Sequence, residues 1–443
     1  MLKERKIRDH RRFACLLGIL LLLIMIRYAF QVDVPRILFL LIIGLIAALG
    51  DKNEIIAMCI CSIPMHESID FYYALVICLA VYVFKYHSSL SFGANLVLVL
   101  IITIWELLHC FATSFDIILF LTYIVPFVLL AILMASDTEN VDYPFIVRAF
   151  AFSVLGISLI LFVRVLYFSN FNFAVALAGL QRMGSDEHSG IQNVEISGGQ
   201  INSNSLGIIA VLASTGLMQL RAMKVSKKSD MIIMCIILVL AALGTSRTYL
   251  ACLAMMIILL IFSEKGGLVN KLRLITALFL AVGAAVAAMA LIFPDTFEYF
   301  VSRFSVKDIT TGRDSLMVQY HAFIVNNPLV MFFGIGLQDF GDRLIYDYMV
   351  ADNVPHNSVQ EIIVIWGIPG LLLFAAQLFS MYRVSIRKNS NLSLINWIPL
   401  IIIIFKGMAG QTITSGYTML ALAFAYLSLC QDFSNKKWHE NSL

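Results

Sequence analysis

The chain has 443 residues, of which 60% are hydrophobic and only 13% are charged, with a mean hydropathy of +0.89. A soluble domain carries about 25% charged residues, so this composition excludes one. The net charge of +3 says little, because the placement of Lys and Arg matters more in membrane proteins than their sum. We predict an all-α, polytopic integral membrane protein.

The N-terminal segment, 1–12, is basic and leads directly into an apolar run. No small-residue cleavage site follows it, which predicts an uncleaved first helix. The 8 cysteines all fall in apolar runs, so no disulfide framework or metal-ligand spacing is indicated.

Apolar runs that can span a membrane recur along the whole chain, and some are shorter than the usual requirement of about 20 residues. We therefore expect about 12 to 14 spans. They lie near 13–30, 36–49, 54–63, 71–86, 94–110, 117–135, 145–168, 203–222, 231–245, 248–263, 271–293, 358–382, 393–409 and 413–430.

Cations cluster before the first span and in several connections, among them 224–228, 265–273 and 383–388. If these connections face the cytoplasm, fourteen spans place both termini inside. Two long connections then lie outside, 181–202 and 294–355. The second has 62 residues and is the only large segment outside the membrane, which is typical of a functional loop.

The external loop 294–355 contains the pattern of a short helix. Thr311 and Asp314 are candidate caps, and the helix would end at Asn327-Pro328. Its apolar positions form one face. Gly334-Ile335-Gly336 then predicts a turn or a close backbone approach.

The segment from Pro355 to Gly370 joins this loop to the next span. Ser358 and Glu361 have the spacing of a capping box, which predicts a helix starting at Ser358. His356 and Asn357 would then lie at an anion-attracting helix N-terminus. The alternative is that Asn357 and Ser358 only cap the helix and His356 is a solvated loop residue.

Arg247 occupies a predicted external turn, 244–248, where an arginine is costly unless it reaches water or an anion. Its planar fork suits phosphate oxygens. The alternative is an interfacial arginine that extends to lipid headgroups. Further cations at the same predicted depth suggest an anionic substrate; they are Arg27, Arg164, Arg182, Arg303, Arg313, Arg343 and Lys406.

Other kinds of site find no support in the sequence. No Asp-x-Asp pair or His/Asp cluster suggests a divalent metal, and no Walker A loop occurs. Intramembrane carboxylates are scarce, Glu106 beside Trp105 being the clearest, which argues against an ion-coupled transporter.

The spacing His356-Asn357, nine residues, Gly367, two residues, Gly370 resembles the signature of O-antigen ligases and the related O-antigen polymerase (Wzy) proteins. Three more motifs follow that superfamily's order: Asn202-Ser203-Asn204 entering a span, Ser246-Arg247 at an external turn, and Gly312-Arg313 followed by Asn327-Pro328 and Gly334-Ile335-Gly336. The resemblance covers about 180–430. It divides the chain into N-terminal transmembrane helices, 1–180, and a catalytic region, 181–443.

The resemblance implies a glycosyltransferase at the outer face of the cytoplasmic membrane, without metal or cofactor, that uses a polyprenyl-diphosphate-linked oligosaccharide. It implies membrane lipid, a flippase and a chain-length regulator as partners, and no nucleic acid. His356 would be the general base and Arg247 would stabilise the diphosphate leaving group. Arg313 and Arg182 would be second clamps, and Asn357, Asn204 and Lys406 further substrate-binding residues. The Gly-Ile-Pro-Gly segment 367–370 would bend its span.

We predict the first of the following three functions, and the other two are its alternatives. The first is a polymerase that builds O-antigen, capsule or exopolysaccharide from repeat units with inversion of the anomeric centre. The second is an O-antigen ligase with a lipid A core acceptor. The third is a polysaccharide or lipid flippase or transporter, for which internal repeats and charges along a central path would be expected.

Overall fold

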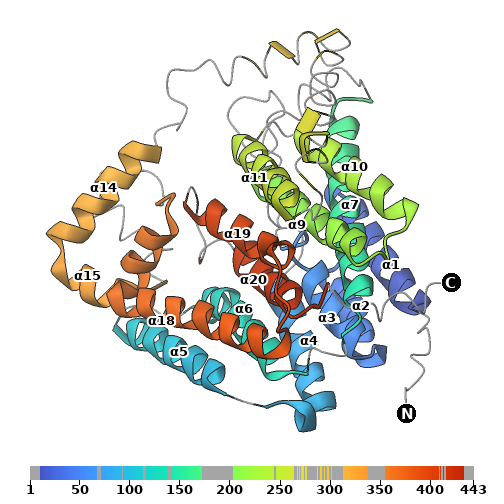
Figure 1. Ribbon diagram of the computed structural model, residues 1–443. Coiled ribbons are helices and arrows are strands. Elements are labelled where there is room, and N and C mark those ends of the chain that lie inside the picture. Colours follow the sequence, from blue (N-terminus) through green and yellow to red (C-terminus); the bar gives the residue numbers. More distant parts are fainter. Residues whose placement is uncertain are drawn as a thin grey trace.

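The computed structural model describes residues 10–66, 71–91, 93–112, 116–137, 141–171, 203–243, 246–263, 313–337, 355–408 and 416–433, with single positions or short stretches between 267 and 301 and at 410 and 413. Every regular element in these ranges is helical (Figure 1). The elements are α1 (Arg11–Ala29), α2 (Arg36–Leu49), α3 (Lys52–Cys61), α4 (Phe71–Tyr86), η1 (His87–Ser89), α5 (Ala94–Ala112), α6 (Ile117–Ala135), α7 (Tyr143–Phe168), α9 (Ser203–Ala222), α10 (Lys228–Leu243), α11 (Arg247–Ser263), α14 (Arg313–Asn326), α15 (Pro328–Phe333), α18 (Ser358–Lys388), α19 (Leu394–Met408) and α20 (Gly416–Leu429).

The predicted spans coincide with these helices, apart from 271–293, most of which lies outside the described residues. Among the described helices, six are long and apolar enough to cross a membrane, and α2, α11, α19 and α20 are shorter apolar helices. The class of an all-α polytopic membrane protein is confirmed. The total of 12 to 14 spans stays a prediction, because only the described part of the chain enters this comparison.

Aspartates cap the N-termini of several helices. Asp51 accepts the amides of Asn53 (2.8 Å) and Glu54 (3.0 Å), and Glu54 reaches back to the Asp51 amide at 3.1 Å. This is a complete capping box at the start of α3. Asp116 caps α6 in a similar way, with its carboxylate 2.7 Å from the amide of Ile118.

The helix ends gather at two faces of the bundle. We call the end that carries Arg247, His356 and the connection 410–413 the site face, and the other end the opposite face. At the opposite face, Lys85 of α4 donates to the carbonyls of Ala48 (2.6 Å) and Gly50 (2.9 Å) at the end of α2. Cations there satisfy carbonyls that have no partner within the helix.

Aromatic contacts join helix ends at the site face. The guanidinium of Arg164 in α7 lies 4.2 Å from the ring of Tyr28 in α1. The rings of His66, after α3, and Tyr417, at the start of α20, are 5.1 Å apart. Contacts at each face join ends that the sequence places on the same side, so the alternation of spans agrees with the prediction. Which face is external stays a prediction.

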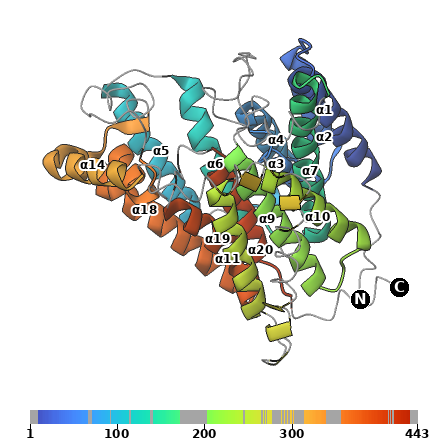
Figure 2. The ribbon, with the colours of Figure 1, turned by 90° about the horizontal axis from the view of Figure 1, so that it is seen from above.

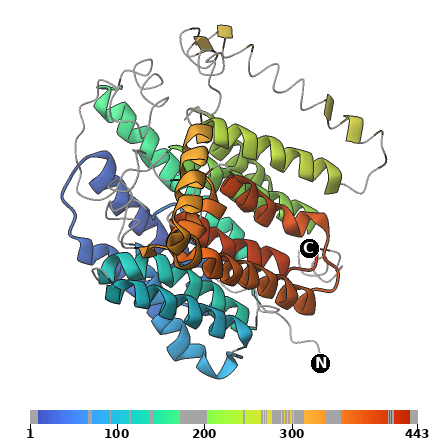
Figure 3. The same ribbon diagram turned by 90° about the vertical axis from the view of Figure 1, so that its left-hand side faces the viewer.

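The core of the bundle is formed by helices that are buried on all sides. Every residue from Tyr417 to Leu429 of α20 is buried, and α9 is buried over most of its length. The helix pair α14–α15 lies at one margin beside α18 (Figures 1 and 2) and faces the viewer in Figure 3. The segment 355–370 therefore lies between the buried core and this marginal pair.

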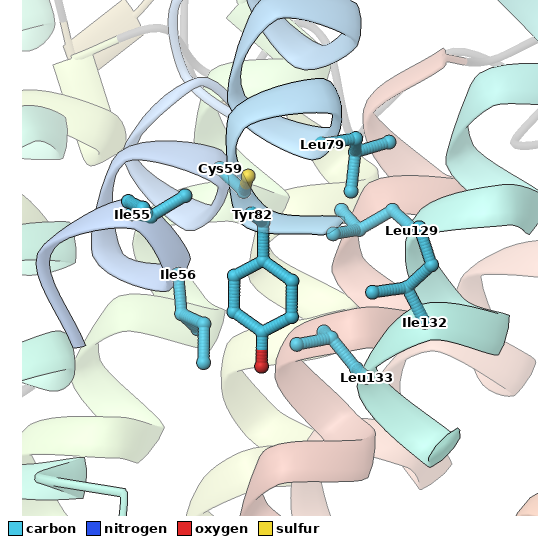
Figure 4. A pocket seen from close by; sticks show the side chains of 8 residues that line it. All are labelled: Ile55, Ile56, Cys59, Leu79, Tyr82, Leu129, Ile132 and Leu133. Atoms are coloured by element: carbon cyan, nitrogen blue, oxygen red, sulfur yellow. The ribbon is translucent and has the colours of Figure 1, made fainter. Parts of the chain in front are cut away.

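A small pocket of about 190 Å³ lies between α3, α4 and α6 (Figure 4). Its lining is aliphatic apart from Cys59 and Tyr82, and the Tyr82 hydroxyl donates to Ser136 Oγ at 2.9 Å. No charged side chain lines it. A pocket of this composition does not suit a diphosphate, so we place the candidate site elsewhere.

Candidate active site at the start of α18

The helix α18 begins at Ser358, as the sequence predicts, but its cap differs from the predicted one. Asn357 is the N-cap, and its Oδ1 accepts the amides of Val359 (2.9 Å) and Gln360 (3.2 Å). The predicted capping box of Ser358 with Glu361 is wrong. Of the alternative, the cap by Asn357 is confirmed, whereas Ser358 does not cap the helix. His356 immediately precedes this cap and is half-buried.

Glu361 and Ser358 instead hold the start of α18 against the connection between α19 and α20. Glu361 is fully buried, and its Oε2 accepts the amide of Ile413 at 3.2 Å. Ser358 Oγ donates to the carbonyl of Gly410 at 3.2 Å. These two bonds fix the end of the helix next to His356 from a segment more than fifty residues away. A long-range contact has therefore replaced the local capping bond.

Lys406 lies beside the same connection, near the end of α19. Its side chain is only 6% exposed, and its Nζ donates to Thr418 Oγ1 at 2.9 Å and lies 5.0 Å from the Tyr417 ring centre. A side chain added at Gly410 would come within 3.2 Å of Lys406 Cε. The sequence placed this lysine at headgroup depth with the other cations. The structure buries it in the bundle, next to the connection that holds α18.

Arg247 is the first residue of α11 and is half-buried. The preceding Ser246 caps the helix, with its Oγ 3.2 Å from the amide of Tyr249. The helix α11 packs against α19 and α9. A Cβ at Gly207 of α9 would lie 2.7 Å from Tyr249 Cβ, so the two helices are in close contact near their site-face ends.

The structure thus gathers three of the predicted site elements at one face: the starts of α11 and α18 and the end of α19. Asn204 is in the first turn of α9, also at this face, but its side chain lies outside the described residues, as does that of Arg313, the first residue of α14. Arg182 lies entirely outside them. Arg27 and Arg164 lie over aromatic rings, which fits headgroup anchors.

The motif glycine Gly367 breaks α18. Its backbone has φ 69° and ψ −171°, a region that only glycine adopts readily. A Cβ there would lie 2.5 Å from the carbonyl oxygen of Phe332. Pro369 then falls in the first turn of the continuing helix, where a missing N–H costs nothing. The predicted bend at 367–370 is confirmed.

The segment after α15 packs against this break. Gly334 has φ 78°, and a Cβ there would lie 2.2 Å from the carbonyl oxygen of Ile365. The amide of Ile335 donates to the carbonyl of Val364 at 2.8 Å. The predicted close backbone approach at Gly334-Ile335-Gly336 is therefore a contact between the loop 294–355 and α18, in which glycines of two motifs meet.

Sequence reasoning missed the residue that joins these two segments. Glu106 of α5 is 1% exposed, and its carboxylate accepts the indole N–H of Trp366 at 2.7 Å and the amide of Leu337 at 3.0 Å. The sequence used Glu106 only as an argument against a transporter. The available signal was the cost of a lone carboxylate within a span, which requires donors from elsewhere in the fold.

The described residues contain no group of three or more His, Cys, Asp or Glu side chains arranged to hold a metal ion. What they offer at the site face is an imidazole at a helix start, an arginine at another, and a buried lysine. This set suits proton transfer from a hydroxyl together with binding of a phosphate-like anion.

Comparison with protein families gives a match in the second half of the chain. Residues 231–375, about a third of the chain, match the family model described as O-Antigen ligase. The matched region runs from α10 into α18 and contains Arg247, Arg313, His356 and the glycines of the α18 break. Comparison with curated proteins gives no match. The match supports the resemblance of this region to the O-antigen ligase/polymerase superfamily.

Proposed function

We propose that the protein is a membrane glycosyltransferase that polymerises polyprenyl-diphosphate-linked oligosaccharide repeat units. Its product would be O-antigen, capsule or exopolysaccharide, made at the outer face of the cytoplasmic membrane. The family match supports the general activity. The observation that carries the site is the start of α18, held by buried bonds at Ser358 and Glu361 with His356 directly before it.

The charges around this helix start support a diphosphate-bearing donor. Lys406 lies beside the connection that holds α18, and Arg247 starts a helix that packs on α19. Guanidinium and ammonium groups at a partly buried site bind phosphate oxygens more strongly than they do in water. Arg313, Arg182, Asn204 and Asn357 are further candidates for donor binding.

The reaction assigns one role to each charged group. A sugar hydroxyl of the acceptor attacks the anomeric carbon of the donor, and its proton passes to the neutral His356 imidazole. The bond from the anomeric carbon to the diphosphate oxygen breaks, and polyprenyl diphosphate leaves with that electron pair. Arg247 neutralises the charge that grows on this oxygen. Attack from the side opposite the diphosphate inverts the anomeric centre, and no metal takes part.

Two alternative functions would each give a different experimental result. An O-antigen ligase would use the same site with a lipid A core acceptor. A deletion strain distinguishes the two: one repeat unit on the core indicates a lost polymerase, and full-length chains on the lipid carrier indicate a lost ligase. A flippase or transporter would leave the purified protein without glycosyl transfer. The flippase and chain-length regulator stay expected partners.

The test of the proposed function is a rate assay with purified protein in lipid, using a polyprenyl-diphosphate-linked oligosaccharide. His356→Ala removes the base and should lower the rate by about 10²–10⁴-fold, with normal membrane insertion. Ser358→Ala is the matched control two residues away. It loses the bond to Gly410 but keeps the Glu361–Ile413 bond and the Asn357 cap at the start of α18, so it should keep most activity. Arg247→Lys keeps the charge but loses the bidentate fork, so its rate should also fall sharply.

The pH dependence gives a further check on the same protein. The wild-type rate should fall as the pH drops through the range in which imidazoles take up a proton. A His356→Ala protein with a near-normal rate would exclude the imidazole as base. Full activity of Arg247→Lys would reduce Arg247 to a headgroup anchor.

A further inference from the structure

The break in α18 leaves backbone groups that the helix itself does not satisfy. Pro369 has no N–H to donate to the carbonyl of Ile365, its usual partner in a helix. The carbonyls on either side of that residue bond outside the helix. Val364 accepts the amide of Ile335 at 2.8 Å, and Trp366 accepts the indole N–H of Trp105 at 3.2 Å. The hydrogen-bond donors for the carbonyls at the break therefore come from α5 and from the segment after α15.

Glu106 joins all three segments through one carboxylate. It projects from α5, accepts Trp366 from the last turn before the break, and accepts Leu337 from the segment after α15. One turn further along α5, the ring Nε2 of His109 lies 2.9 Å from the carbonyl oxygen of Phe333. A buried carboxylate costs several kcal/mol of desolvation, which an apolar side chain at the same place would avoid. Such a residue is therefore a candidate for fixing geometry.

The geometry that Glu106 fixes is the direction of the outer part of α18, Ser358–Trp366. These nine residues form a rod of about 13 Å, with Glu106 at one end and His356 just beyond the other. A tilt of about 10° at the break would move the far end by about 2 Å. Displacements of about 1 Å at a reacting group can cost about 10²-fold in rate.

We infer that Glu106 is a positioning residue for His356, acting through Trp366 and the outer part of α18. This inference rests on the proposed function only in naming His356 as the residue whose position Glu106 fixes. Glu106 lies in the N-terminal half, outside the region that matches the family, and more than 200 residues from the groups it holds.

The test is Glu106→Gln, which keeps the shape of the side chain. Its amide NH₂ would face an N–H of Trp366 or Leu337, donor against donor, so one of the two bonds is lost. The matched control is Asp230→Asn in α10. That residue is also a buried carboxylate, 2% exposed, but it pairs with Arg148 at 3.2 Å at the opposite face.

Two structural readouts do not depend on the activity. Hydrogen exchange followed by mass spectrometry should show faster exchange in 358–366 and 334–337 together in Glu106→Gln, and not in Asp230→Asn. The resonance Raman band of the Trp366 indole N–H, assigned by difference from Trp366→Phe, should shift toward a weaker hydrogen bond. Unchanged exchange and an unchanged band would overturn the inference, whatever the protein's activity.

The kinetic readout is a double-mutant cycle. Glu106→Gln should lower kcat about 10- to 100-fold with little change in KM, and it should have no further effect in a His356→Ala background. The same factor in both backgrounds would mean that Glu106 does not act through His356. If His356→Ala itself keeps a normal rate, the role of His356 as base fails, while the exchange and Raman results still decide what Glu106 holds.

If Glu106→Gln does not accumulate in the membrane, Trp366→Phe replaces it in these experiments. Trp366→Phe removes the indole donor and keeps an aromatic ring at this position. It carries the same expected exchange pattern and the same non-additivity with His356→Ala. Normal exchange in 358–366 for this variant would equally overturn the inference.

Discussion

The side-chain oxygen of Asn357 accepts two backbone amides at the start of α18. A substrate would therefore meet the NH₂ group of this side chain and not its oxygen. The same residue is at once the helix cap and a predicted substrate ligand, and the two roles call for different chemistry. A cap needs an acceptor, whereas a diphosphate needs a donor without negative charge.

Asn357→Asp separates the two roles. Asp caps as well as Asn, and its charge is favourable at a helix N-terminus by about 0.3–1 kcal/mol, so thermal stability should stay equal or rise. The carboxylate would repel a diphosphate, so KM for the donor should rise about tenfold or more. Asn357→Ser, which caps without adding charge, is the control. An unchanged KM in Asn357→Asp would leave Asn357 the role of a cap alone.

At the scale of elements, the break in α18 depends on two close backbone approaches, at Gly334 and Gly367. Each glycine lies against the carbonyl of the other segment, so neither admits a side chain without moving the contact. Gly334 and Gly367 thus determine how the segment after α15 packs against α18.

Gly367→Ala should therefore be strongly destabilising. The new Cβ would meet the Phe332 carbonyl, and the φ of 69° costs a non-glycine residue about 1–3 kcal/mol. Thermal unfolding in detergent should show a clearly lower midpoint. Gly44→Ala in α2 is the control, since nothing lies within 4 Å of its new Cβ, and its midpoint should be equal or higher. Equal midpoints for both variants would contradict the docking role of Gly367.

The spans were predictable because each is encoded by its own local run of apolar residues. The bend at 367–370 followed from the Gly-Ile-Pro-Gly segment, and the start of α18 followed from the spacing of Ser358 and Glu361, although that capping box does not form. The capping residue was not predictable from the sequence. Glu361 accepts the amide of Ile413 and not an amide at its own helix start, and the local spacing of residues does not reveal such a distant partner. The partners of Glu106 lie 231 and 260 residues away, so no motif contains the junction. The site residues themselves remain predictions.

For the whole molecule, the site face and the opposite face group the helix ends as the sequence predicts. The region that matches the family is completed by α5, from the N-terminal half, through Trp105, Glu106 and His109. Bonds therefore cross the proposed boundary near residue 180. We expect the C-terminal region expressed alone to lack a fixed α18 break.

The sidedness of the two faces is a separate prediction. A reporter enzyme active only outside the membrane should give signal when fused after Val330 in α15, and none when fused after Lys228 at the start of α10. The reason is the excess of Lys and Arg in connections at the opposite face. The fusions need only expression in cells and a control for protein level. The reverse pattern would place His356 and Arg247 on the cytoplasmic side and contradict the proposed site at the outer face.

The break in α18 also bears on how much of this helix lies within the hydrocarbon layer of the membrane. The helix has 31 residues, which would measure about 46 Å if straight, against about 30 Å for a hydrocarbon layer. The part after Gly367, 368–388, measures about 31 Å and fills that thickness alone. In Figure 1 the outer part rises from the end of the inner part in a different direction. With 368–388 across the hydrocarbon layer, we expect His356 to lie near the membrane surface, displaced sideways from the axis of that inner part and beside the connection between α19 and α20.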